Sequence, residues 1–307
     1  MGRYVIRRLL QMVPVFLGAT LLLFVMVYAL GDPVAALSGD RAPDPATAAQ
    51  IRRELYLDHP LWQQYLHYMG QILSGDFGTA FDGQPVLGKM ATAFPVTLRL
   101  TLVAIAFEVV LGVTLGLLGG LRRGRALDST TLVMTLLVVS VPTFVSGYLL
   151  QFLLGVKWGL VRPAVTPGAP LDELLLPGAV LALVSLAYVT RLTRTSVAEN
   201  VRADYVRTAV AKGVPRRRLV LRHVLRNSLI PVVTFVGADI GTLMGGAVVT
   251  ERIFNVHGVG YELYQGIVRQ NSPTVVGFVT VLVIVFLLAG LFVDLLYAVL
   301  DPRIRYV

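Results

Sequence analysis

The 307-residue sequence contains no cysteine and only few charged residues. Without cysteine, the chain forms no disulfide, no thiolate metal site and no cysteine nucleophile. Charged residues make up 15% of the chain, whereas hydrophobic residues make up 55%. This balance excludes an ordinary soluble globular protein and predicts an integral membrane protein.

Histidine is also scarce, and none of the four histidines falls within a long apolar run. A membrane serine hydrolase needs a base beside its buried nucleophile, so this distribution argues against that class. The histidines are too scattered along the chain to predict a metal site. We therefore expect no covalent chemistry, no cofactor and no metal in this chain.

Six apolar runs are long enough to cross a bilayer. They cover residues 9–30, 96–119, 130–154, 174–190, 232–249 and 275–300 of what we interpret as one membrane domain over 1–307. Segments on one side of these runs hold 18 of the 27 Lys and Arg residues. Since cytoplasmic segments collect basic residues, both termini are predicted to be cytoplasmic. The net charge of +9 then reflects topology and does not indicate nucleic-acid binding.

The predicted outer loop over residues 31–95 contains the stretch "PLWQQYLHYMGQILSG". Its apolar residues recur on one helical face, which predicts an amphipathic helix. The helix could lie on the membrane surface, with Trp62 and Tyr68 at the interface, or it could cap the helix bundle. Further on, "GQPVLGKM" at 83–90 has the spacing of a phosphate loop but ends in Met and follows no strand, so it predicts no ATP site.

The segment 191–231 is predicted to be cytoplasmic and contains "DYVRTAVAKG". Asp204 is a suitable N-cap and Gly213 can adopt the left-handed conformation that ends helices, so a helix is predicted over 205–212. Its small residues would make a smooth surface, flanked by basic side chains, that suits docking into a cleft of another protein. A basic loop that only enforces topology would explain the segment equally well.

A second helix is predicted after Val214 and Pro215, because proline is tolerated in a first turn. Within it, Arg218, Arg222 and Arg226 recur every fourth residue. One face of this helix could therefore meet lipid headgroups.

Two carboxylates inside apolar runs, Glu108 and Asp239, are candidate pathway residues, because ionisable groups in lipid are costly and usually functional. Around Asp239, Gly237, Gly241 and Gly245 have the spacing that permits close helix approach. An ion-coupled secondary transporter or channel that works without partners, with ions bound near these carboxylates, is one function that they could serve.

Several stretches together resemble the permease subunits of ABC importers, specifically the dipeptide, oligopeptide and nickel group. They are "GDPV" at 31–34, "GDFG" in the outer loop, "DYVRTAVAKGV", "RHVLRNSLIPVVT", "GGAVVTERIF" and "FVDLLYAVLDPRIR". The long outer loop is similar to that of the first, B-type subunit. The resemblance implies an all-α integral membrane protein with six transmembrane helices and the type I importer fold.

By this resemblance, the helix within 191–231 would be a coupling helix that docks on a separate ATPase. The residues implied in coupling are Asp204, Tyr205, Arg207, Thr208, Ala209, Lys212 and Gly213. The family pattern begins Glu-Ala-Ala, and Arg207 and Thr208 replace its first two residues here. An outer gate region is implied at Phe254, His257 and Tyr261, where the family usually has proline in place of His257.

The implied function is ATP-driven import of dipeptides or short oligopeptides across a bacterial plasma membrane. The implied partners are a second homologous permease, two ATPase domains that bind ATP and Mg, an extracytoplasmic substrate-binding protein and membrane lipid. Asp239 could meet the amino terminus of the peptide. The ion-coupled secondary transporter stays the alternative.

Overall fold

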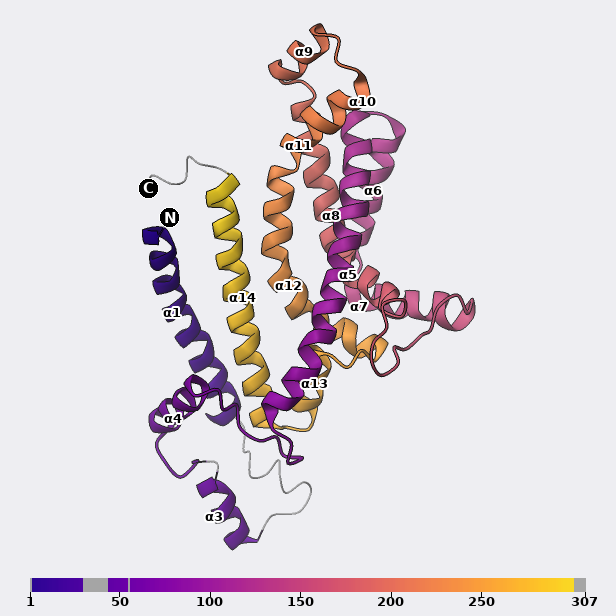
Figure 1. Ribbon diagram of the computed structural model, residues 1–307. Helices are drawn as coiled ribbons and strands as arrows, with labels where there is room; N and C mark the ends of the chain where they lie inside the picture. The colour runs from indigo at the N-terminus through magenta and orange to yellow at the C-terminus, as the bar shows by residue number, and fades with distance from the viewer. Residues whose placement is uncertain (1, 30–43, 55, 301–307) are drawn as a thin grey trace. The chain divides into compact units, whose positions relative to one another are not determined.

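The computed structural model describes residues 2–29, 44–54 and 56–300 (Figure 1). These residues form helices joined by turns, with one isolated β-bridge between Thr79 and Pro85. The predicted all-α membrane class is confirmed. The "GDPV" stretch and the last residues of "FVDLLYAVLDPRIR" lie outside the described residues.

The chain divides into two units, and α5 (Val86–Leu121) and α14 (Ser272–Leu300) contribute residues to both. Unit 1 comprises residues 1–97 and 257–287. Its other helices are α1 (Gly2–Phe24), the π-helix η1 (Val25–Ala29), α3 (Pro45–Glu54), α4 (Leu61–Leu73) and α13 (Val259–Val268). Its core is apolar and includes the buried side chains of Val86, Met90, Leu263 and Phe278.

Helix α4 is the amphipathic helix predicted in the outer loop, and it packs on other helices of unit 1. The Tyr65 hydroxyl lies 3.0 Å from that of Thr20 on α1. The Tyr68 hydroxyl, which was expected at a membrane interface, hydrogen-bonds with Thr280 on α14. Trp62 is 62% exposed. These contacts favour the cap over the helix that only lies on the membrane surface.

Five helices are apolar and long enough to cross a membrane: Val5–Tyr28, Val86–Leu121, Leu175–Asn200, Ile230–Phe254 and Ser272–Leu295. They match five of the six predicted runs, but α5 begins ten residues earlier than predicted, with Pro95 inside it. Helix α8 (Leu175–Asn200) likewise runs to residue 200 where 190 was predicted. Apolar runs mark only the part of a helix that suits lipid, and both helices continue through polar residues beyond it.

The third predicted run, 130–154, is not one straight span. Helix α6 (Ala126–Ser140) is followed by α7 (Thr143–Leu150) and the π-helix η2 (Gln151–Lys157), at an angle of 100°. Val141 between them is extended, because the ring of Pro142 disfavours helical geometry in the preceding residue. The described helices thus provide five spans, or six if this bent pair crosses as one.

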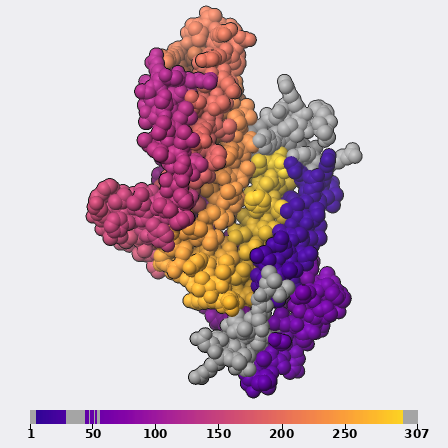
Figure 2. Space-filling view, turned by 180° about the vertical axis from the view of Figure 1, so that it is seen from behind, coloured from indigo at the N-terminus to yellow at the C-terminus, as the bar shows by residue number. Residues whose placement is uncertain are grey.

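Unit 2 comprises residues 98–256 and 288–307, and α8 lies at its centre. More than half of the apolar window of α8 is buried, although its apolar run was the shortest of the six. Around it pack α5, α6 and α12 (Ile230–Phe254). Figure 2 shows the segment after the break at Pro142 as an arm that stands out from the rest of this unit.

Glycines on α5 allow that helix to approach α8 closely. A Cβ atom added at Gly116 would lie 2.5 Å from Thr193 Cβ and 2.6 Å from the Thr190 carbonyl oxygen. At Gly112 and Gly120, one turn away on either side, an added Cβ atom would lie 2.8 Å from its nearest neighbour. On α12, an added Cβ atom at Gly245 would have no atom within 4 Å, so this glycine does not mark a close approach, whereas Gly237 and Gly241 are buried.

Candidate functional site

The predicted helix in the segment 191–231 is present as α9 (Asp204–Ala211), which lies beyond the end of α8 in unit 2 (Figure 1). Gly213 ends it with φ +72°, as expected for a left-handed residue after a helix. The prediction that Asp204 caps the helix is wrong. Ala203 occupies the cap position in an extended conformation, and Asp204 is the first helical residue, with its carboxylate 3.5 Å from Arg207.

One face of α9 is built into unit 2. Val206 is 4% exposed and packs in a buried cluster with Val197 of α8 and Val224. Ala209, one turn further along α9, is also buried. The prediction that Ala209 contributes to an outward docking surface is therefore wrong, because its methyl group faces its own chain.

The other face of α9 is open to partners. Tyr205 is 38% and Val210 58% exposed, and Arg207 and Lys212 are exposed beside them. The Thr208 hydroxyl, also exposed, donates to the Asp204 carbonyl oxygen at 3.0 Å. An apolar and aromatic patch with basic neighbours results, which is the composition of a protein-docking surface.

The predicted second helix consists of three short pieces that lead into α12. They are α10 (Arg216–Arg218), the π-helix η3 (Leu219–Val224) and α11 (Leu225–Ser228). Pro215 is the N-cap residue of the first piece, and Pro231 lies in the first turn of α12. Arg222 and Arg226 stay exposed on consecutive turns.

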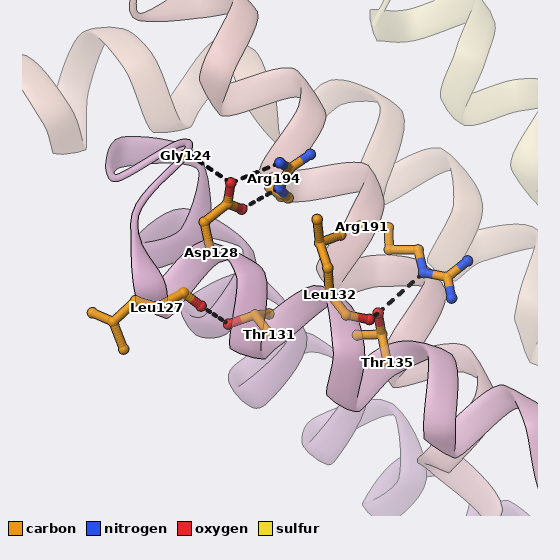
Figure 3. Close-up of polar contacts among 8 residues, drawn as sticks. All are labelled: Gly124, Leu127, Asp128, Thr131, Leu132, Thr135, Arg191 and Arg194. Carbon is orange, nitrogen blue, oxygen red and sulfur yellow. Dashed lines mark hydrogen bonds and ion pairs between the residues drawn. The ribbon is translucent and has the colours of Figure 1, made fainter.

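An ion pair that the sequence analysis missed joins α6 to α8 at the same end of unit 2 (Figure 3). Both oxygens of Asp128 accept hydrogen bonds from the Arg194 guanidinium, one of them at 2.8 Å from Nη2. The Gly124 backbone N–H donates to the same carboxylate at 2.8 Å. The Asp128 side chain is 4% and that of Arg194 17% exposed. About one turn along α8, Arg191 donates to the Thr135 hydroxyl at 3.1 Å.

The structure brings the two predicted pathway carboxylates together inside unit 2. Glu108 on α5 is fully buried and Asp239 on α12 is 7% exposed, and the two carboxyl groups interact electrostatically. Ser185 of α8 hydrogen-bonds to Asp239. Among the described residues, neither oxygen of Glu108 and only one oxygen of Asp239 has a hydrogen-bond partner. Two buried carboxyl groups that interact electrostatically cannot both carry charge at low cost.

The three predicted gate residues belong to different parts of the fold. Phe254 is the last residue of α12 and is 1% exposed, so it is a core residue of unit 2. In unit 1, the exposed His257 ring lies against the Tyr261 ring at a centroid distance of 4.5 Å. His257 lies two residues before α13, and Tyr261 lies in the first turn of that helix.

The arm after Pro142 is fastened to the end of α12. The Gln151 side-chain amide donates to the carbonyl oxygens of Pro163 and Ile253, each at 2.7 Å. The Val165 backbone N–H donates to the Phe254 carbonyl oxygen at 2.8 Å. These bonds fix the loop of the arm against a span.

Within the arm, Glu173 accepts hydrogen bonds from the Thr166 backbone N–H at 2.7 Å and from its hydroxyl at 2.8 Å. These bonds, with the Arg162 guanidinium at 2.6 Å, hold the pKa of Glu173 below its usual range. A carboxyl group with a lowered pKa stabilises the fold above its unfolded pKa and loses that effect as the pH falls through its folded pKa.

We therefore expect the arm to loosen below about pH 4. Trp158 at the start of this loop can report the change, because Trp62 is the only other tryptophan. In a Trp62→Phe background, the Trp158 fluorescence should show an acid transition that Glu173→Gln abolishes. Asp172→Asn, a neighbouring exposed carboxylate, should keep it. An unchanged transition in Glu173→Gln would show that this carboxylate does not fasten the loop.

Comparison with known proteins gives full-length matches. Residues 112–306 match the family described as binding-protein-dependent transport system inner membrane component, and residues 1–101 match its N-terminal counterpart. The dipeptide transport system permease protein of Escherichia coli is 37% identical over 100% of this chain and 99% of its own length.

Two further relatives are similar to the same extent. The di/tripeptide transport system permease protein of Pseudomonas aeruginosa is 36% identical, covering 99% of this chain and 98% of its own. The glutathione transport system permease protein of Salmonella choleraesuis is 36% identical over the whole of both chains. Family matches and relatives agree with the apolar helices, and the chain therefore belongs to the family of binding-protein-dependent transport system inner membrane components, the permeases of ABC importers.

Proposed function

We propose that this permease imports short peptides and that α9 is its contact with a separate ATPase. The observation that carries the coupling role is the two-sided burial of α9. Its inner face is packed into the helices of unit 2, and its outer face presents Tyr205, Arg207 and Val210 to solvent. A partner that pushes this outer face would act on α5 and α8 through the inner one.

The cargo follows from what the relatives are named for. Dipeptides, tripeptides and glutathione share an ammonium group, peptide bonds and a carboxylate. Asp239, with one unpartnered oxygen and slight exposure, is the group that would meet the ammonium of such a peptide. The fully buried Glu108 would not contact the peptide but would influence the charge of Asp239 through their electrostatic interaction.

The complete importer would contain a second homologous permease, two ATPase domains and an extracytoplasmic binding protein. ATP and Mg would be bound by the ATPases, and this chain would perform no covalent chemistry. The excess of Lys and Arg in these segments supports the part of the proposal that puts α9 and both termini on the cytoplasmic side of a bacterial plasma membrane.

The coupling role can be tested by placing charge on the outer face of α9. In the purified importer, Val210→Asp combined with Arg207→Glu should lower peptide-stimulated ATP hydrolysis and peptide uptake at least about tenfold. The double variant removes both an exposed apolar contact and a neighbouring positive charge from the docking face. Arg217→Glu, an exposed change in α10 of the same segment, should leave both rates nearly unchanged. Equal rates in all three proteins would refute the docking role of α9.

A second candidate, the ion-coupled secondary transporter, is favoured by the unpartnered oxygens of Glu108 and Asp239. It requires that the chain alone, reconstituted into vesicles, takes up a labelled dipeptide without ATPase subunits. In that case Glu108→Gln or Asp239→Asn should abolish the dependence of uptake on an ion gradient. Uptake that depends on added ATPases and ATP would instead exclude this candidate.

A further inference from the structure

A pocket of about 520 Å³ opens in unit 2 between α9 and the start of α12. Three basic side chains line it, Arg222, His223 and Arg226, together with Tyr205 of α9. Of the described residues that line the pocket, none is acidic. The pocket therefore concentrates positive charge without a carboxylate of its own to neutralise it.

The two arginines are available to a ligand. They lie four residues apart, so their side chains leave the same side of the segment formed by η3 and α11. Both are exposed, and in the part of the chain that the structure describes neither guanidinium makes a hydrogen bond or ion pair. Guanidinium groups bind phosphate oxygens in two-pronged fashion, so an adjacent pair is well suited to one phosphate group.

Most of the remaining pocket wall is apolar and indicates where the pocket lies relative to the membrane. Leu229, Ile230 and Val233 line it, and Ile230 and Val233 are 46% and 42% exposed. Ile230 is also the first residue of the candidate span Ile230–Phe254. The pocket thus joins the last charged turn to the first apolar turn, where the phosphates of lipid headgroups lie.

We propose that this pocket binds the phosphodiester headgroup of an anionic phospholipid, with the phosphate on Arg222 and Arg226 and an acyl chain along Ile230 and Val233. A free phosphate ion would use the arginines but not the apolar wall. Because Tyr205 belongs to α9 and lines the same pocket, the bound lipid would touch the helix assigned to coupling.

Native mass spectrometry of the assembled importer tests this site. After removal of native lipid, the complex is titrated with dioleoyl phosphatidylglycerol or with dioleoyl phosphatidylcholine, in the presence and absence of inorganic phosphate. The anionic lipid should bind and the zwitterionic lipid should not. Arg222→Gln combined with Arg226→Gln should weaken phosphatidylglycerol binding at least about tenfold, as expected for two basic groups near a headgroup.

The matched control removes the same charge from the same segment, outside the pocket. Arg216→Gln combined with Arg217→Gln should retain binding within about twofold. Arg222→Lys combined with Arg226→Lys keeps the charge and should retain most of the binding, even if the glutamine pair folds poorly. Equal loss in the control pair, or full competition by inorganic phosphate, would overturn the lipid site.

The pocket could also be covered by a protein, and the same samples distinguish this outcome. If the glutamine pair binds phosphatidylglycerol normally but loses its ATPase subunits, the arginines dock a protein and the lipid proposal is wrong. Failure of the α9 variants to lower ATP hydrolysis would refute the coupling role and leave the lipid measurement unaffected.

Discussion

Replacing Gly116 with alanine is expected to destabilise the permease strongly. The added methyl carbon would lie 2.5 Å from Thr193 Cβ and 2.6 Å from the Thr190 carbonyl oxygen, closer than carbon atoms can pack. The obstacle includes main-chain atoms, so no change of rotamer relieves it, and α5 must move away from α8. We expect a loss of about 3 kcal/mol in the free energy of unfolding. In detergent the apparent Tm should fall by about 5 °C or more.

Gly245→Ala is the matched control, because Gly245 is also helical but has no atom within 4 Å of the added carbon. It should leave the Tm unchanged or raise it slightly, since alanine favours helices over glycine. Gly112→Ala and Gly120→Ala should behave as Gly116→Ala does. A Gly116→Ala protein with the same apparent Tm as the native protein would show that α5 and α8 are further apart than described.

Removing one partner of the Asp128 and Arg194 pair should have the second large effect. In Asp128→Leu, the Arg194 guanidinium, whose side chain is 17% exposed, loses both of its hydrogen bonds to the carboxylate. A mostly buried charge left without its counter-ion costs about 3 kcal/mol. The Tm of the variant in detergent, and its free energy of unfolding where denaturation is reversible, would measure this cost.

The double variant Asp128→Leu with Arg194→Leu separates lost charge pairing from lost packing. If the unpaired charge is the cause, the double variant should be more stable than Asp128→Leu alone, because two apolar groups replace a desolvated pair. Asp82→Asn, which breaks the pair with Lys89 at a side chain 41% exposed, should cost under about 1 kcal/mol. Equal losses for Asp82→Asn and Asp128→Leu would contradict the importance of burial.

The sequence was sufficient to predict the helical membrane class and most spans, because long apolar runs have few alternatives in a bilayer. It also predicted α9 to within one residue at either end, because Gly213 has no Cβ to resist positive φ and therefore ends a helix well. The break at Val141 and Pro142 was missed because hydropathy stays high across it, and hydropathy does not report backbone geometry. The available signal was Pro142 itself, a proline inside an apolar run. A proline alone does not prove a break, since α5 continues through Pro95.

Contacts between distant residues could not be predicted in this way. Asp128 and Arg194 are 66 positions apart, and each alone resembles an ordinary charged residue near a span end. Ala209 was predicted on the outer face of α9 because a small residue suits close packing against a partner protein, but it suits close packing within its own chain equally well. Ala209 and Val210 both lie about one helical turn after Val206, so the sequence alone does not show which of the two faces inward. The packing of Val206 against Val197 and Val224 identifies the inward face of α9.

The buried cluster beneath α9 has a mechanical consequence. Val206, Val197 and Val224 fill their shared space with branched side chains at the density of a solid, and such packing is hardly compressible. A load on α9 should therefore reach α8 with little loss. Val206→Ala would leave a cavity in this cluster. The same displacement of α9 would then be absorbed by local rearrangement and would move α8 less.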